Sequence, residues 1–328
     1  MYNRRYINNH IKPFSIIIGF AASMQLYIAY NAIGGVDINV YWLQAPHLDY
    51  AIPRYYQEPV SWGLIKFLTN LERSEFLFAF SLAVLSIAIL RLGVVGGLIL
   101  YASFLSPFGV MMEFNVLRQC LATVFLTFFI LAILSEKRIA AATWGVLAIL
   151  SHNSVLLIGG FLLFMNYYSL FSRKWKVISV LAVILLTGIL QIYDGIDFIL
   201  GSRVDSYSSI IRRDGLQDLI YFGFAMAFSL LLFFKTQQRK WRPISVGLAA
   251  ALLFTVVVCS LLSLDTWVYG RMAMTVVVIC HFLLLYDVWE TRRVGLMGLL
   301  FLFSMIVING LTILFHPGAL SMVQPYGD

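Results

Sequence analysis

The chain has 328 residues, of which 61% are apolar, 15% aromatic and only 12% charged, and its mean hydropathy is +0.87. Soluble domains are about 45–50% apolar and about 25% charged, so this composition is typical of an integral membrane protein and excludes a disordered or a collagen-like chain. The three cysteines all lie in apolar stretches, which excludes a secreted disulfide scaffold.

Apolar stretches recur along the whole chain, most of them near the roughly 20 residues that a helix needs to cross a hydrocarbon core. They cover residues 14–33, 76–90, 92–112, 117–134, 139–150, 154–170, 177–193, 219–234, 243–263, 272–289 and 294–315. We predict an all-α, polytopic membrane protein with about 11 transmembrane segments, forming a single transmembrane domain over residues 1–328. Two longer connections, 34–75 and 194–218, are predicted outer loops.

The basic residues predict the orientation, because Lys and Arg are retained on the cytoplasmic side of a membrane. If the amino terminus lies inside and the chain alternates through all eleven segments, 15 of the 23 basic residues fall inside and 13 of the 16 acidic residues fall outside. The net charge of +7 is then a topology signal and does not indicate a nucleic-acid partner. We expect an inside amino terminus and an outside carboxyl terminus.

The stretch between Arg138 and Arg173 departs from the regular pattern. Both arginines are predicted to lie inside, yet only 34 residues separate them, and the polar sequence Ser151-His152-Asn153-Ser154 stands at the midpoint. Residues 139–150 extend only about 18 Å as a helix. We predict a short or broken helical hairpin with His152 close to its apex, the alternative being one long tilted helix with a polar kink.

A polar group opens the fourth apolar segment. Asn115, Arg118 and Gln119 have the i, i+3 and i+4 spacing that places side chains on one face of a helix. An arginine inside a membrane helix is costly without a partner or a polar cavity, and its guanidinium fits the oxygens of a pyrophosphate. We predict that Arg118 binds a pyrophosphate. The alternatives are an arginine that reaches the lipid headgroups or one paired with Glu113.

A second arginine, Arg271, opens the tenth segment after Trp267-Val268-Tyr269-Gly270. It is predicted to lie at the same outer depth as Arg118, so the two guanidinium groups could hold one dianionic group. The alternative is a belt of interfacial aromatic and basic residues, with Asp265 as a structural partner of Arg271.

The two outer loops supply further candidates. Loop 194–218 is either solvated or a substrate-binding segment, in which contacts with phosphate or sugar would come from Arg203, Arg212, Arg213 and Tyr207. In loop 34–75, a helical face is predicted after Pro59, which indicates an amphipathic helix lying along the outer membrane surface. Its apolar residues are Val60, Leu64, Phe67, Leu68 and Leu71. Glu58, just before it, is either a helix-terminus acid or a carboxylate that faces a cavity.

Sequence patterns that bind metals or nucleotides are absent. The chain contains no HExxH, no cysteine pair and no His/Asp cluster, and it has neither a Walker nor a Rossmann glycine pattern. We expect neither a metal nor another cofactor.

Several of these motifs together resemble a known family. Phe114-Asn115-x-x-Arg118-Gln119-x-x-Ala122, followed by a short basic loop and His152-Asn153-Ser154, resembles the EpsG-like group of bacterial polysaccharide polymerases related to Wzy. Gly35-Val36-Asp37-x-x-x-Tyr41 and Glu58-Pro59 look like the upstream signals of that family. The resemblance covers residues 31–170 and continues beyond them mainly as hydropathy and the Arg271 motif.

The resemblance implies a metal-independent, GT-C-like membrane glycosyltransferase at the outer face of the bacterial cytoplasmic (inner) membrane. It would transfer a growing glycan from undecaprenyl pyrophosphate to the non-reducing end of a lipid-linked repeat unit, in the biosynthesis of O-antigen lipopolysaccharide, capsule or exopolysaccharide. Partners would be the two lipid-linked oligosaccharides, membrane lipids and, as a candidate, a chain-length regulator. The alternatives are an O-antigen ligase and a lipid-linked oligosaccharide flippase or transporter.

Such a transfer needs positive charge for the leaving pyrophosphate and a base for the attacking hydroxyl. Arg118 and Arg271 are the predicted electrostatic groups, and Asn115 and Gln119 would orient the pyrophosphate or the sugar. His152 is the predicted base, because burial favours its neutral form. Glu58 and Glu113 are the carboxylate alternatives.

Overall fold

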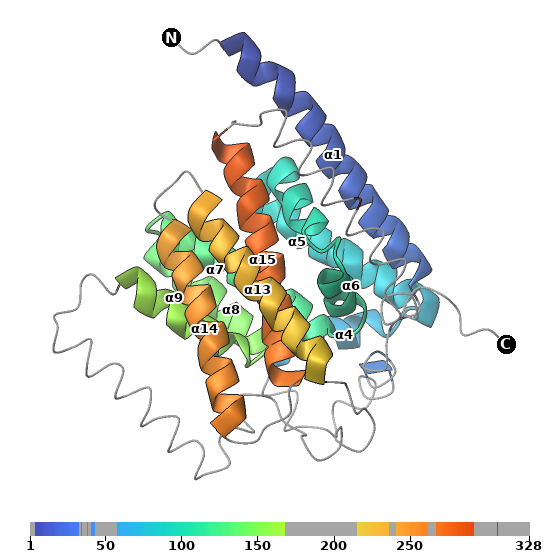
Figure 1. Ribbon diagram of the computed structural model, residues 1–328. Helices are drawn as coiled ribbons and strands as arrows, with labels where there is room; N and C mark the ends of the chain where they lie inside the picture. The colour runs from blue at the N-terminus through green and yellow to red at the C-terminus, as the bar shows by residue number, and fades with distance from the viewer. Residues whose placement is uncertain are drawn as a thin grey trace. The chain divides into compact units, whose positions relative to one another are not determined.

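The regular secondary structure of the described residues is α-helical. The computed structural model describes residues 4–32, 34, 38, 41–42, 58–167, 215–235, 241–261, 267–291 and 307. Their helices are α1 (Arg4–Asn31), α4 (Pro59–Leu68), α5 (Arg73–Ala102), α6 (Pro107–Phe114), α7 (Leu117–Leu134), α8 (Arg138–Ser151), α9 (Val155–Tyr167), α13 (Gly215–Lys235), α14 (Trp241–Leu261) and α15 (Trp267–Thr291) (Figure 1). The all-α class is therefore confirmed for this part of the chain.

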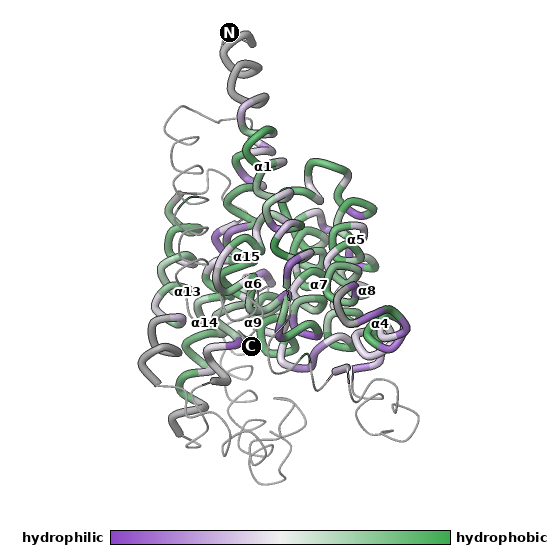
Figure 2. Tube along the Cα trace, turned by 90° about the vertical axis from the view of Figure 1, so that its right-hand side faces the viewer, coloured by the Kyte–Doolittle hydropathy of each residue, from purple (hydrophilic) through white to green (hydrophobic). Residues whose placement is uncertain are grey.

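Four helical stretches are long and apolar enough to cross a membrane: Pro13–Asn31, Glu75–Ala102, Leu117–Leu134 and Gly270–Thr291. Apolar side chains on the first two also face outward, since Phe20 is 64% and Leu90 is 87% exposed. A helix that is hydrophobic on its outer as well as its inner side is typical of a bilayer. Hydrophobic residues dominate most of the helices drawn in Figure 2. These features support a membrane-embedded protein.

The four spans are fewer than the eleven predicted segments. The remaining apolar helical stretches among the described residues are shorter: Arg138–Ser151, Val155–Tyr167, Tyr221–Phe234 and Trp241–Val257. Two predicted segments lie outside the described residues: 177–193 entirely, and 294–315 except for residue 307. The segment count and the orientation of the termini stay predictions.

The helices fall into two compact units, one of residues 1–124 and 281–328 and the other of residues 125–280. In the first unit α1 packs along α5, and α4 also contacts α5. Phe14 of α1 stacks on Trp289 of α15, with their ring centroids 6.1 Å apart. Thus the first unit joins helices from both ends of the chain.

The second unit packs α14 against α9 and α13. A Cβ atom at Gly247 of α14 would lie 3.2 Å from the Leu162 Cα atom of α9. Small residues at such crossings let two membrane helices approach closely. Ser245 of α14 also donates a hydrogen bond to the Ser229 carbonyl of α13 at 2.5 Å.

Helix α5 contains a sharp reversal at Gly93. This residue has φ of 75° and ψ of 171°, a conformation that L side chains rarely adopt. Ser81 and Tyr101, twenty positions apart, hydrogen-bond through their hydroxyl groups, whereas a straight helix would separate them by about 30 Å. The two arms, residues 73–92 and 94–102, therefore fold back on each other. The reversal agrees with the predicted boundary between segments 76–90 and 92–112, but the second segment is not one helix, because it is interrupted between Ala102 and Pro107.

Replacing Gly97 with alanine is expected to lower the unfolding temperature. A Cβ atom there would lie 2.6 Å from the backbone nitrogen of Ile89 in the other arm, and overpacking of this kind costs about 1–3 kcal/mol. The control is Gly160→Ala in α9, where nothing lies within 4 Å of the added atom. Thermal unfolding in detergent micelles compares the two variants; equal unfolding temperatures would contradict close packing of the arms.

A capped turn separates α5 from α6. Ser106 Oγ accepts a hydrogen bond from the Gly109 N–H group at 3.0 Å, and Pro107 stands at the start of the helix, where its missing N–H group is no loss. Helix α6 ends at Phe114 and α7 begins at Leu117. Glu113 and Arg118 thus lie on two different helices, on either side of a short junction.

The predicted interruption at His152 is present. Helix α8 ends at Ser151 and α9 begins at Val155, and His152 has an extended backbone with φ of −160° and ψ of 122°. Three consecutive residues, 152–154, therefore lie outside regular helix, and the reversal of the chain at this break stays a prediction.

The predicted helix after Pro59 is also present, as α4. Its buried face consists of Ser61, Trp62, Ile65 and Leu68. Phe67, from the predicted apolar face, is 71% exposed. An outward apolar residue is consistent with a helix at a membrane surface, which stays a prediction.

Candidate functional site

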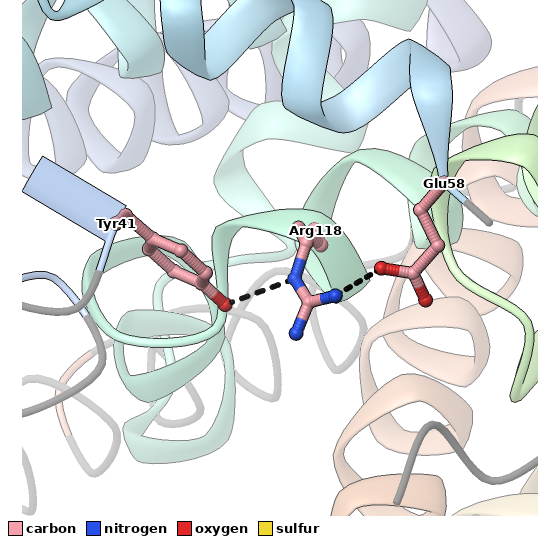
Figure 3. A network of polar contacts seen from close by, with 3 residues as sticks. All are labelled: Tyr41, Glu58 and Arg118. Atoms are coloured by element: carbon pink, nitrogen blue, oxygen red, sulfur yellow. Dashed lines mark hydrogen bonds and ion pairs between the residues drawn. The ribbon is translucent and has the colours of Figure 1, made fainter. Parts of the chain in front are cut away.

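Arg118 is the centre of an ion-paired cluster in the first unit. It lies in the first turn of α7, and its Nη1 group donates to Oε2 of Glu58, which immediately precedes α4. Its Nε group donates to the Tyr41 hydroxyl at 3.4 Å. Figure 3 shows Tyr41 and Glu58 on opposite sides of the guanidinium group. Two residues that lie 77 and 60 positions earlier in the chain therefore fix this arginine.

Two aromatic rings support the same guanidinium group. Its central carbon lies 5.5 Å from the ring centroid of Tyr41 and 5.1 Å from that of Trp62. The two rings meet edge to face, with centroids 5.5 Å apart, and both are buried. Such cation–π contacts hold the arginine in place without neutralising its charge.

Arg118 keeps hydrogen-bonding capacity for a ligand. A guanidinium carries five N–H donors, and the Tyr41 and Glu58 contacts use one on Nε and one on Nη1. The hydrogen bonds of Arg118 to described residues involve Nε and Nη1 and not Nη2. The Arg118 side chain is 23% exposed, whereas that of Glu58 is only 3% exposed. An oxyanion could thus reach the free edge while Glu58 and Tyr41 hold the other side.

The ion pair settles two alternatives left open by the sequence. Arg118 pairs with Glu58 and not with Glu113. Glu58 stands at the N-cap position of α4 but makes no capping hydrogen bond with its side chain. Its carboxylate therefore pairs with Arg118 and does not cap α4 by a hydrogen bond.

The predicted shared face of Asn115, Arg118 and Gln119 is only partly correct. Asn115 has φ of −133° and ψ of −43° and lies before α7 begins, so helical spacing does not apply to it. Gln119 follows Arg118 in the first turn but is fully buried, and Asn115 is 8% exposed. Of the three residues, Arg118 has the most accessible side chain.

Glu113 belongs to a second polar cluster of the first unit. Its carboxylate accepts hydrogen bonds from Gln25 of α1 and Ser81 of α5, and Ser81 also bonds the Tyr101 hydroxyl. Burial raises the pKa of Glu113 to about 7, although the hydrogen bonds from Ser81, Gln25 and Tyr101 act in the opposite direction. Near neutral pH this carboxyl group is therefore poised between its two protonation states.

His152 and Arg271 belong to the second unit. His152 is buried at the break between α8 and α9, and its backbone N–H group donates to the Ala148 carbonyl at 3.0 Å. Arg271 is half-buried in the first turns of α15. Their predicted placement beside Arg118 stays a prediction.

The other predicted site residues lie outside the described residues. These are Arg203, Arg212, Arg213 and Tyr207 of loop 194–218, together with Asp37 of the Gly-x-Asp element. Their roles stay predictions. Within the described residues no group of three or more His, Cys, Asp or Glu side chains could hold a metal ion.

The site contains residues to which the sequence had assigned no role. Tyr41 and Trp62 hold Arg118, and Gln25, Ser81 and Tyr101 surround Glu113. A signal existed for Gln25, because an amide in the middle of an apolar segment usually finds a polar partner inside the protein. Tyr41 stands in the motif Gly35-Val36-Asp37-x-x-x-Tyr41, whereas Trp62 had no comparable signal.

Comparison with known proteins adds no relative. The chain matches no protein-family model, no curated protein and no solved structure.

Proposed function

We propose that this protein is a polysaccharide polymerase: a membrane glycosyltransferase that uses a glycan on undecaprenyl pyrophosphate as donor and a lipid-linked repeat unit as acceptor. The observation that carries the proposal is the geometry of Arg118. This arginine of an apolar helix forms an ion pair with a buried glutamate, while part of its side chain stays accessible. Its surrounding motif, with Glu58-Pro59 before and His152-Asn153-Ser154 after, resembles the EpsG-like polymerases. The resemblance supplies the substrate class, and the geometry of Arg118 supports an anionic ligand.

The proposed reaction transfers one glycan. A hydroxyl oxygen of the acceptor sugar attacks the anomeric carbon of the donor glycan, and the bond from that carbon to the pyrophosphate oxygen breaks. The hydroxyl proton passes to a base, proposed to be His152, with Glu58 as the carboxylate alternative. Arg118, together with Arg271, stabilises the negative charge that develops on the departing undecaprenyl pyrophosphate.

The proposed setting is the outer face of a bacterial cytoplasmic membrane. In this proposal the distribution of basic residues places the amino terminus inside, and hydropathy gives about eleven segments. The GT-C-like arrangement comes from the family resemblance. The outward Phe67 of α4 supports a helix at the same membrane surface.

Reconstitution tests the function directly. Purified protein in vesicles is given lipid-linked repeat units alone, without nucleotide or metal, and the products are separated by gel electrophoresis. A ladder of increasing glycan length is expected. In a second set of vesicles that also contain lipid A core, transfer to that core without a ladder would instead indicate a ligase. Movement of the repeat units across the bilayer without new bonds would indicate a flippase.

Replacing His152 with alanine is expected to leave single lipid-linked repeats accumulating, because the attacking hydroxyl loses its base. Loss of a general base lowers rates by about 10²–10⁴-fold. The control is Asn153→Ala at the same break. Normal chain lengths in the His152 variant would move the role of base to Glu58.

A further inference from the structure

Glu113 is the centre of a fully buried cluster in the first unit. Its Oε2 atom accepts a hydrogen bond from Gln25 Nε2, and its Oε1 atom accepts one from Ser81 Oγ at 2.5 Å. The Tyr101 hydroxyl forms a hydrogen bond with the Ser81 hydroxyl and also lies next to the Glu113 carboxyl group. All four side chains are fully buried. The cluster connects α1, both arms of α5, and α6.

Among the described residues, no cation balances the Glu113 carboxylate. Within the described ranges, Glu113 forms no ion pair with Lys or Arg, and the titratable groups that face it are Tyr101 of α5 and Cys120 of α7. Neither of these carries a positive charge. Burying an uncompensated carboxylate is costly, whereas a neutral carboxylic acid is much cheaper to bury.

The Gln25 amide can serve the neutral form of Glu113. Its Oε1 atom is buried and has no hydrogen-bond partner among the described residues. If the amide turns over, this oxygen takes the place of the nitrogen and accepts the proton of the carboxylic acid, while Ser81 still donates to the other Glu113 oxygen. When Glu113 is ionised, Gln25 Nε2 donates a hydrogen bond to its carboxylate instead. The cluster therefore contains a partner for each protonation state.

We propose that Glu113 is a positioning residue and not the base: a buried carboxylic acid, protonated in the stable form of the protein, that fastens α1 and both arms of α5 to α6. Glu113 lies in the last turn of α6 and Arg118 in the first turn of α7, with the junction residues Asn115 and Val116 between them. Loss of the proton adds an unbalanced buried charge and loosens this junction. The effect on Arg118 rests on the function proposed above, whereas the effect on folding does not.

Thermal unfolding in detergent micelles between pH 5 and pH 8.5 tests the folding part. The pKa of Glu113 is raised in the folded protein to about 7 from an ordinary 4.5, so its stabilising effect is complete at pH values below the ordinary one and is lost as the pH rises through 7. The wild type should lose unfolding temperature over this range more steeply than Glu113→Gln, which stays neutral. Glu113→Ala, which removes the hydrogen bonds, should unfold about 5 °C lower or more at every pH.

The control for charge alone is Glu75→Gln, at an exposed glutamate of α5. Its pH profile should run parallel to that of the wild type. Parallel profiles for wild type and Glu113→Gln, or an unfolding temperature of Glu113→Gln as low as that of Glu113→Ala, would overturn the proposal.

Ladder formation with the same variants tests the positioning part. Glu113→Gln should restore most of the polymerisation that Glu113→Ala loses, and it should retain activity above pH 7.5, where the wild type declines. If Glu113→Gln unfolds like the wild type at acid pH but forms no ladder at any pH, Glu113 takes part in the chemistry and is not a positioning residue. If the wild type itself forms no ladder, the proposed function fails, and the unfolding profiles still decide whether Glu113 is a buried acid.

Discussion

Replacing Arg118 with lysine is expected to lower polymer formation by about 100-fold or more, since one lost donor to developing negative charge costs about 10²–10³ in rate. Lysine keeps the positive charge but not the planar fork that donates to Tyr41 and Glu58 at once while leaving Nη2 free. The loss should appear as missing ladders in reconstituted vesicles at unchanged protein content.

The matched control is Arg138→Lys at the exposed start of α8. It makes the same chemical change on the surface and should leave the ladders intact. Full-length polysaccharide from Arg118→Lys would remove the main support for a pyrophosphate ligand at this arginine. A loss of inserted protein in that variant would instead assign Arg118 a structural role.

Replacing Glu58 with alanine is expected to destabilise the first unit and to abolish ladders. Glu58 is almost fully buried while Arg118 is partly exposed. Breaking a wholly buried pair costs about 3–5 kcal/mol and an exposed one at most about 1 kcal/mol, so an intermediate loss of about 2 kcal/mol is expected here. Thermal unfolding in detergent micelles measures it.

The double variant Glu58→Ala/Arg118→Ala separates the pair from its surroundings. Because the second substitution removes the charge that the first leaves without its carboxylate, the double variant should lose less stability than the two single variants together. Strictly additive losses would show that the two side chains contribute independently. Glu75→Gln serves again as the control for removing a glutamate charge.

The helical segments were predictable because apolar periodicity is a local property. The break at residues 152–154 could be found from four consecutive polar residues between two short apolar runs, and the α5 reversal from the lone Arg91 between two apolar runs. Local patterns of this kind are set by the length of helix that a bilayer can hold.

The partner of Arg118 was not predictable in the same way. Glu58 lies 60 positions earlier in the chain, and Glu113, only five positions away, was the natural candidate. Helical spacing relates residues three or four positions apart, but it says nothing about a carboxylate that another helix carries. Glu113 instead accepts hydrogen bonds from Gln25 of α1 and Ser81 of α5.

The short second arm of α5 affects how this region can enter a bilayer. Residues 94–102 form about 13 Å of helix, far less than the about 30 Å of a hydrocarbon core. During biosynthesis this arm cannot be stable in lipid as an independent span, since its ends would leave backbone groups without water. Its position in a bilayer therefore depends on packing against residues 73–92, to which the hydroxyl bond between Ser81 and Tyr101 connects it.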